Sequence, residues 1–279
     1  MRFVFKITSA VALACLAASP PPAVGLAGSA WAQPAETAPA PPDIRLLEAA
    51  QRGDAAAQYR LGAIYETGLG IARDEVQAAQ WYRRAAEQGL ATAQFSLARM
   101  YADGRGVPMA LAEMVLWLRK AAEQGHAEAQ RGLGFLHIEG RGVPRDDAAA
   151  ADWFRKAAEQ GDTTAELFLG SAYAGGLGVP RDDAQAVLWL RKAAEKGSAG
   201  GLAHLGVMYA FGWGTGRDPV LAAMLHRLAA NAGNTFAQGR FGRLVQQLSP
   251  AQKAEVEALA AGWRVNTPLP RESRTGRGG

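Results

Sequence analysis

The chain has 279 residues, with 30 Lys or Arg, 26 Asp or Glu and a formal net charge of +4. The excess of positive charge lies at the two ends, because residues 1–32 contain Arg2 and Lys6 without an acid, and residues 264–279 contain four arginines and one glutamate. The residues between have a net charge of −1. A nucleic-acid-binding module needs clustered cations, so this distribution argues against one. The 49% of hydrophobic residues exclude a disordered chain.

The N-terminus has the pattern of an export signal. Arg2 and Lys6 precede an apolar run over residues 7–18, and Ala30-Trp31-Ala32 offers small residues at a cleavage site. We expect cleavage after Ala32 and a periplasmic or secreted protein that is not inserted in the membrane. Two alternatives are lipid attachment at Cys15, for which Leu13 has the wrong offset, and an uncleaved anchor, for which the apolar run is short.

Cysteine usage restricts the chemistry further. Cys15 is the only cysteine, so the chain after cleavage has none. This predicts no disulfide framework, no zinc–cysteine site and no thiol nucleophile. Residues 33–42 (QPAETAPAPP) are rich in Pro and Ala, and we expect them to form a linker.

The rest of the chain repeats every 36 residues. Five units cover residues 55–90, 91–126, 127–162, 163–198 and 199–234. Each unit has Leu in one column, Gly-x-Gly near its middle and Ala-Ala near its end, and four have Trp in the second half. The Trp column is Trp81, Trp117, Trp153 and Trp189, with Leu225 in the fifth unit. A period of this length is typical of a solenoid whose units stack.

The spacing within one unit predicts two helices. Ala57, Leu61 and Tyr65 recur at steps of four, and a second apolar stripe follows the Gly-x-Gly. The glycines suit a connection with positive φ. Asp74, Asp146, Asp182 and Asp218 stand where they can cap the second helix, with Gln77 and Gln185 as capping-box partners and Ala110 as the exception.

Partial units flank the five repeats. Residues 43–54 end like a second helix and predict an N-terminal capping helix. Residues 235–263 begin a sixth unit, and the cap signal Ser249-Pro250-Ala251-Gln252 predicts a closing helix over residues 253–261. We expect residues 264–279 to form a disordered basic tail.

The repeated pattern A-x-x-x-L-G-x-x-Y, G-x-G-V, A-x-x-W, A-A-E-x-G resembles that of the SEL-one-like repeat (SLR) family, which is related to tetratricopeptide repeats. The resemblance covers residues 55–234, with local departures at His137 and Leu225. It implies an all-α, right-handed α-solenoid of helix-turn-helix repeats with a 36-residue period.

Candidate sites of chemistry are few. The four histidines have no metal-ligand spacing, and His137 replaces a packing Tyr, so a core role is favoured. The glycine loops lack the full nucleotide-binding motifs, and capping explains Asp146 and Asp182 better than calcium binding does. Ser171 lacks the flanking residues of a nucleophile elbow. We therefore predict no catalytic residue, no metal, no cofactor and no enzyme.

The family resemblance places the first helices on a concave side. It implies a binding face on which aromatic and Arg residues, the types enriched at binding hot spots, are exposed. The face comprises Tyr59, Phe95, Arg99, Arg131, Phe135 and Leu167, with Arg240 and Arg243 near the end. The alternative is that Phe95, Phe135 and Leu167 fill space between repeats.

These observations favour an exported, non-catalytic protein–protein interaction scaffold or adaptor that holds a protein or peptide on its concave face. The resemblance adds a role in envelope signalling or in secretion. An enzyme that binds or hydrolyses β-lactams and an envelope-glycan-binding protein are the alternatives. The cysteine-rich relatives that suggest the first of these have disulfides that this chain cannot form.

Overall fold

A computed structural model describes residues 43–270 of the chain. Thirteen helices are the regular elements of this range, which contains no strand. They form two compact blocks, residues 43–145 and 146–270, which are considered separately. The predicted signal peptide (1–32), the linker (33–42) and the end of the predicted tail (271–279) lie outside the described residues.

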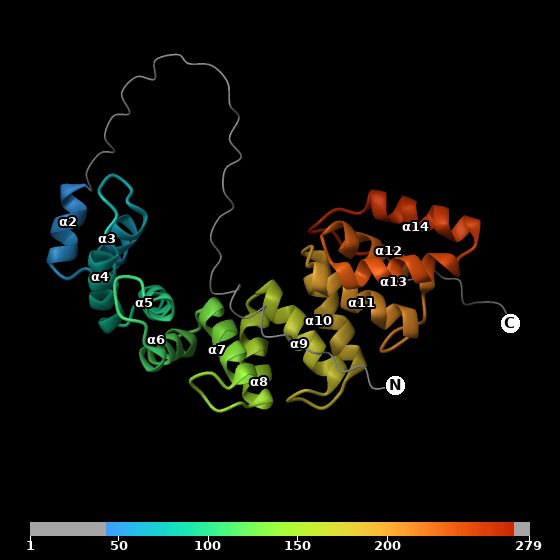
Figure 1. Ribbon diagram of the computed structural model, residues 1–279, viewed down its shortest axis with the longest axis horizontal. Coiled ribbons are helices and arrows are strands. Elements are labelled where there is room, and N and C mark those ends of the chain that lie inside the picture. The colour runs from blue at the N-terminus through green and yellow to red at the C-terminus, as the bar shows by residue number, and fades with distance from the viewer. Residues whose placement is uncertain (1–42, 271–279) are drawn as a thin grey trace, which may run out of the picture. The chain divides into compact units, whose positions relative to one another are not determined.

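In the N-terminal block each helix packs against the next one along the chain (Figure 1). Its helices are α2 (Ile44–Gln51), α3 (Ala55–Thr67), α4 (Glu75–Glu87), α5 (Ala91–Asp103), α6 (Leu111–Glu123) and α7 (Ala127–Glu139). The predicted capping helix is α2, which packs against α3. We call α3, α5, α7, α9 and α11 the first helices of the repeats and their partners α4, α6, α8, α10 and α12 the second helices.

The C-terminal block continues the same order of helix pairs (Figure 1). Its helices are α8 (Asp147–Glu159), α9 (Thr163–Gly175), α10 (Asp183–Glu195), α11 (Ala199–Phe211), α12 (Pro219–Asn231), α13 (Thr235–Gln246) and α14 (Pro250–Gly262). The closing helix α14 packs against α12. Tandem helix pairs at a 36-residue period confirm the predicted all-α solenoid class.

Aspartate caps fix where the second helices begin. The side chains of Asp74, Asp146, Asp182 and Asp218 each accept bonds from two backbone N–H groups of the first turn, as predicted, and Ala110 makes no such bond. The capping boxes predicted at Gln77 and Gln185 are wrong. The backbone N–H that each glutamine would accept is donated instead to a first-helix carbonyl, by Asp74 to Tyr65 and by Asp182 to Tyr173. A complete capping box does occur at Ser249 and Gln252.

In three repeats the second glycine of Gly-x-Gly has a role beyond its positive φ. A Cβ added at Gly106 would lie 1.9 Å from the carbonyl oxygen of Glu75, and one at Gly178 would lie 1.9 Å from that of Asp147. Gly214 approaches the carbonyl oxygen of Asp183 in the same way, at 2.2 Å. The loop of one repeat therefore rests directly on the first turn of the preceding second helix.

Both helices of each repeat contribute to the core, the first helices with a column of buried leucines and the second helices with their Ala and Trp residues. Trp81, Trp117 and Trp189 are buried, and Trp153 is half-buried. Each Trp ring lies under a cation three residues later, with centroid distances of 3.9–4.4 Å. These cations are Arg84, Lys120, Lys156 and Lys192. Such contacts cover the outward face of the ring while the rest of it packs inside.

A buried polar ladder joins successive repeats. Gln58 donates to the carbonyl of Ala50 at 3.1 Å and accepts from Gln88 at 2.7 Å, and Gln94 repeats both contacts in the next unit. In the fourth repeat Glu166 and Lys196 stand where the first two repeats have the two glutamines. Lys196 Nζ lies 2.7 Å from Oε1 of the buried Glu166. An ion pair thus occupies the place of an amide pair.

The described part of the predicted tail differs from the expectation. Asn266 donates its backbone N–H to the carbonyl of Glu195 at 2.7 Å, and Leu269 donates to the Glu195 carboxylate at 3.1 Å. The Leu269 side chain is only 4% exposed and belongs to the hydrophobic core of this block. Residues 264–270 therefore pack against the end of α10 and are not disordered, since they bring their own apolar anchor.

Candidate binding surface

The predicted face is only partly exposed. Tyr59, Phe95, Arg99, Arg131 and Leu167 are all half-buried. Phe135 is 4% exposed, so its place on an open surface is wrong. It lies on α7, where all six residues from 132 to 137 are buried, so the helix has no exposed side at this position. Phe135 therefore fills space inside the fold, as the alternative interpretation stated.

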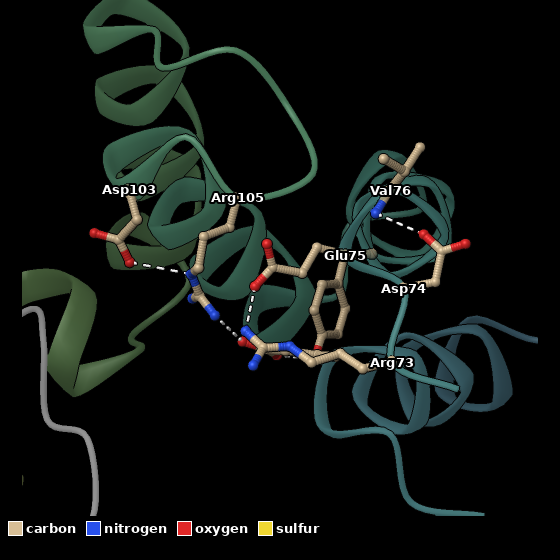
Figure 2. Close-up of polar contacts among 8 residues, drawn as sticks. Arg73, Asp74, Glu75, Val76, Asp103 and Arg105 are labelled. Carbon is tan, nitrogen blue, oxygen red and sulfur yellow. Dashed lines mark hydrogen bonds and ion pairs between the residues drawn. The ribbon is translucent and has the colours of Figure 1, made fainter. Parts of the chain in front are cut away.

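At the N-terminal end of the face, Tyr59 lies beside a carboxylate with several partners. The ring of Tyr59 is 5.5 Å from that of Tyr82, whose hydroxyl donates to Glu66 at 2.7 Å. The other oxygen of Glu66 accepts from Arg105 at 2.8 Å, and Arg105 also lies 3.3 Å from Asp103. Figure 2 shows Asp103 paired with Arg105 on one side and, at the start of α4, the cap that Asp74 forms on Val76.

The electrostatics of this cluster indicate a structural clamp. Burial alone would raise the pKa of Glu66, but the bonds from Tyr82 and Arg105, with the charges of Arg105 and Arg99, hold that pKa below its usual range. Burial and the neighbouring Glu66 raise the pKa of Tyr82. The carboxylate is therefore ionised at neutral pH, and its partners come from two successive repeats.

Phe95 and Arg99 form the centre of the face on α5. The Phe95 ring stacks on that of His126, with centroids 4.6 Å apart. Burial lowers the pKa of His126, an effect that Glu128 opposes in part, so the stack is neutral at pH 7. The Nε atom of Arg99 is buried and has no hydrogen-bond partner. Phe95 therefore fills space between repeats and also remains half open.

In the C-terminal block, beside Leu167, the structure brings together a serine and a histidine that the sequence did not predict to be neighbours. Ser171 Oγ lies 2.9 Å from His204 Nδ1 and donates its proton to the carbonyl of Leu167 at 2.8 Å. With that proton committed, Nδ1 of His204 must be the donor to Ser171. Burial lowers the pKa of His204 to about 4, so the ring is neutral at pH 7. This arrangement does not activate a nucleophile.

The spacing could have revealed this pair. Ser171 and His204 are 33 residues apart, three fewer than one period, so they lie on adjacent first helices. A search for polar residues at this offset would have found them. The repeat pattern alone could not, because neither residue stands in a repeated column.

A second group missed from the sequence lies at the C-terminal end of the first helices. Phe211 and Trp213 stack at 4.8 Å, and the guanidinium of Arg240 lies 4.8 Å from the centroid of Phe236 and 5.9 Å from that of Phe211. Arg181 lies 5.5 Å from the centroid of Trp213. We call these five residues the aromatic–arginine ladder. Of them only Arg240 was expected on the face.

A shallow groove of about 440 Å³ lies on the side of α4. Val76 and Val107 contribute its apolar lining, and Arg83, Arg84 and Glu87 its charges. Arg83 also donates to the hydroxyl of Tyr101. Because both signs of charge line the groove and Arg83 has a partner within the fold, the groove favours no particular ligand.

The described part of the chain has neither a metal-binding cluster nor a membrane-spanning helix. Within residues 43–270, no group of three or more His, Cys, Asp or Glu side chains is arranged to hold a metal ion. No helix in the same range has the length and apolar character needed to cross a bilayer.

Comparison with known proteins gives the family. The Sel1 repeat model matches residues 55–90, 91–126, 127–162, 163–198 and 199–234. A protective antigen of uropathogenic Escherichia coli strains, which displays an SLR fold, is 40% identical over 77% of this chain and 47% of its own, with a TM-score of 0.69. The match thus spans about half of that antigen. A Sel1 repeat protein from Oxalobacter formigenes is 34% identical over 78% of this chain and 96% of its own, with a TM-score of 0.66.

Among curated proteins, none matches the chain. Sel1 repeat proteins are generally scaffolds for protein interactions. Five consecutive matches cover well over half of the chain at the period that the sequence itself shows. The chain therefore belongs to the Sel1 repeat family.

Proposed function

We propose that this protein is an exported, non-catalytic scaffold that holds a protein or peptide segment along the first helices of its repeats. The general role of the Sel1 repeat family supports the scaffold part. The signal-like pattern of residues 1–32 supports export and, with it, a role as an adaptor in envelope signalling or secretion.

One observation on α5 supports the choice of face. The Nε atom of Arg99 is buried without a hydrogen-bond partner, beside the half-exposed ring of Phe95. An unsatisfied charged donor is unfavourable in the isolated protein, and if the half-buried Arg99 side chain turns outward, a carbonyl or carboxylate of a bound chain would satisfy it. Arg and aromatic residues together are also the types that dominate binding energy at interfaces.

The non-catalytic part rests on the geometry around Ser171. Its hydroxyl proton is donated to the Leu167 carbonyl, so His204 does not accept it. The β-lactam alternative requires an activated nucleophile, and turnover of a chromogenic β-lactam by the purified protein would revive it.

The test is a quantitative pull-down from envelope extracts with the full chain and two variants. Arg99→Gln removes the guanidinium and its charge and leaves a shorter polar side chain, and Phe95→Ala removes the aromatic surface. We expect both variants to lose the same partners, as measured by mass spectrometry. The control Leu116→Ala removes a side chain from α6 that is 43% exposed, and it should lose none.

Two results would contradict the proposal. If Arg99→Gln remains folded by circular dichroism and retains every partner, the first-helix face is not the binding surface. If the expressed protein is found in the cytosol with residues 1–32 attached, the export part is wrong.

A further inference from the structure

Two positions of the repeat meet where a second helix packs against the next first helix. In the C-terminal block the ring of Phe154 on α8 stacks on that of Phe168 on α9, with centroids 5.3 Å apart. In the N-terminal block the same positions hold Leu118 and Gly132, and a Cβ added at the glycine would lie 3.2 Å from the leucine. These two junctions are therefore apolar at this point.

The last junction differs in chemistry. Two periods after Phe154 and Phe168, the same positions hold His226 on α12 and Arg240 on α13. His226 is 0% exposed, and neither of its ring nitrogens has a hydrogen-bond partner. Its ring also rests on α11, because a Cβ added at Gly206 would lie 3.0 Å from it. Nothing that contacts the ring accepts a hydrogen bond from it, so a proton there would be unfavourable.

The charged groups around His226 come from the three helices that pack against α12, which are α11, α13 and α14. Burial lowers the pKa of His226, and the charges of Arg240 on α13 and His204 on α11 lower it further. On α14, Glu257 already pairs with Arg227 at 3.5 Å. Protonation of His226 would therefore add a positive charge beside an existing one at the junction with α13.

The helices beyond this junction are held by little apolar burial. Ala237 is the buried residue of α13 and Val256 that of α14, whereas each of the helices α8 to α12 has at least five. The ion pair between Arg227 and Glu257 is 40% and 55% exposed, and pairs of this kind contribute little. Segments with few buried apolar contacts open at a lower free energy than the rest of a fold.

We propose that the junction between α12 and α13 is an acid-sensitive latch, in which protonation of His226 at mildly acidic pH releases α13 and α14 while the earlier repeats stay folded. At neutral pH the two helices close the C-terminal end of the solenoid. Their release would uncover apolar surface of α12, eight of whose residues are buried in the closed state.

Acid favours the open state of this latch. The pKa of His226 is about 4 in the closed state and should return toward 6.5 when α13 leaves. The open state therefore binds more protons between these values, and opening becomes more favourable as the pH falls through them. Between pH 7.5 and pH 5 the equilibrium constant for opening should rise roughly 30-fold.

The test is hydrogen exchange of the full chain followed by mass spectrometry at pH 7.5 and pH 5. Protection factors are compared, since they correct for the effect of pH on the intrinsic exchange rate. We expect protection of α13 and α14 to fall roughly 30-fold at pH 5. The first repeat, residues 55–90, contains no histidine, and its protection should stay within about threefold.

Two variants assign the effect to His226. In His226→Leu the new side chain is the one that Leu118 and Leu190 supply at this position, so the variant should fold and lose most of the response to acid. The matched control is His137→Tyr, which exchanges another histidine for the tyrosine of the other repeats and should respond as the wild type does. Far-ultraviolet circular dichroism checks that each variant is folded.

Three outcomes would overturn the inference. They are equal protection of α13 and α14 at the two pH values, an unchanged fall of their protection in folded His226→Leu, and a loss of protection at pH 5 that includes the first repeat, which would indicate general acid unfolding. None of them bears on the pull-down through Arg99 and Phe95, so the proposed scaffold function is tested separately.

Discussion

His226 is a polar residue in a fully buried position. The equivalent positions of the other repeats are Tyr82, Leu118, Phe154 and Leu190, all buried. His226 is 0% exposed, and neither ring nitrogen has a hydrogen-bond partner. Burial, with the charges of Arg240 and His204, lowers its pKa to about 4. The fold therefore holds this ring in its neutral form.

Replacing His226 with Leu should change how stability depends on pH. The pKa of about 4 in the folded state lies below the unfolded value of 6.5, so the unfolded state binds more protons between these values and stability falls as the pH drops through this range. At pH 5 this loss is about 2 kcal/mol. We expect His226→Leu to be more stable at neutral pH, since it removes two unsatisfied polar atoms, and to lose less stability on acidification.

Urea unfolding followed by circular dichroism at pH 7.5 and pH 5 measures both effects. If the wild type and His226→Leu lose the same stability between the two pH values, the neutral buried histidine is not the cause of the acid sensitivity.

Sequence reasoning at this scale succeeded where the interaction is local and failed where it is not. The aspartate caps were predictable because cap and helix are neighbours in sequence, and all four occur. The burial of Phe135 and the pairing of Ser171 with His204 depend on adjacent helices. The replacement of two glutamines by Glu166 and Lys196 could not be recognised as an ion pair from the sequence, because the contact between these two positions of the repeat is known only from the structure.

At the scale of the element, the loop between the two helices of a repeat sets the spacing of the repeats. Its first glycine ends the first helix with positive φ, 65–74° in the five repeats. Its second glycine lies against the first turn of the preceding second helix. The sequence predicted the first of these roles from the Gly-x-Gly pattern, but it could not predict the second, which requires knowledge of how successive pairs stack.

Gly178→Ala and Gly233→Ala should separate the two roles. Both glycines have positive φ, +69° and +85°, so alanine at either site is strained by roughly 1–2 kcal/mol. A Cβ at Gly233 meets nothing within 4 Å, whereas one at Gly178 would lie 1.9 Å from the Asp147 carbonyl oxygen. We expect Gly178→Ala to cost about 1–3 kcal/mol more, because the backbone must move apart.

Thermal and urea unfolding of the two variants measure the difference. Equal losses would mean that backbone conformation alone explains the repeated spacing of the two glycines and that the close approach is easily relieved. Gly233→Ala is the reference because it lies in the same block.

For the molecule as a whole, the structure moves the end of the folded chain. The sequence predicted the boundary at residue 263 because the following residues are basic and rich in Pro, Gly and Ser. Leu269 shows that the boundary is later, since its side chain enters the core at the end of α10. A single leucine in this segment is too weak a pattern to predict that the segment packs on the fold. The contact depends on two residues at the end of α10 that are far away in sequence, Glu195, which accepts from the Leu269 backbone, and Gly197, which lies against Val265.

Two truncations test this boundary. A chain that ends at Pro270 should be as stable as the full chain within about 0.5 kcal/mol. A chain that ends at Trp263 loses the buried Leu269 and two bonds to Glu195, and should be about 2–4 kcal/mol less stable. Equal stability of the two truncations in urea would show that residues 264–270 contribute nothing to the fold.

The sequence was most informative about the repeating part of the molecule. Period, helix pairs and caps could be predicted because each appears several times, so one departure such as Ala110 does not hide the pattern. The aromatic–arginine ladder could not be predicted in this way, because Phe211, Trp213 and Phe236 occur where no other repeat has an aromatic residue. A feature that occurs in only one repeat cannot be predicted from the periodicity of the sequence.

The contact between each loop and the preceding second helix also bears on how such a chain can lengthen. The second, fourth and fifth repeats each supply a glycine that docks backwards on the first turn of the preceding second helix. Duplication or loss of a block of 36 residues would therefore recreate a junction of the kind already present, with no new surface to be fitted. A few residues added within a loop would instead shift the glycine away from its neighbour. Growth of this protein by whole modules is thus compatible with its packing, whereas growth by small insertions between the paired helices is not.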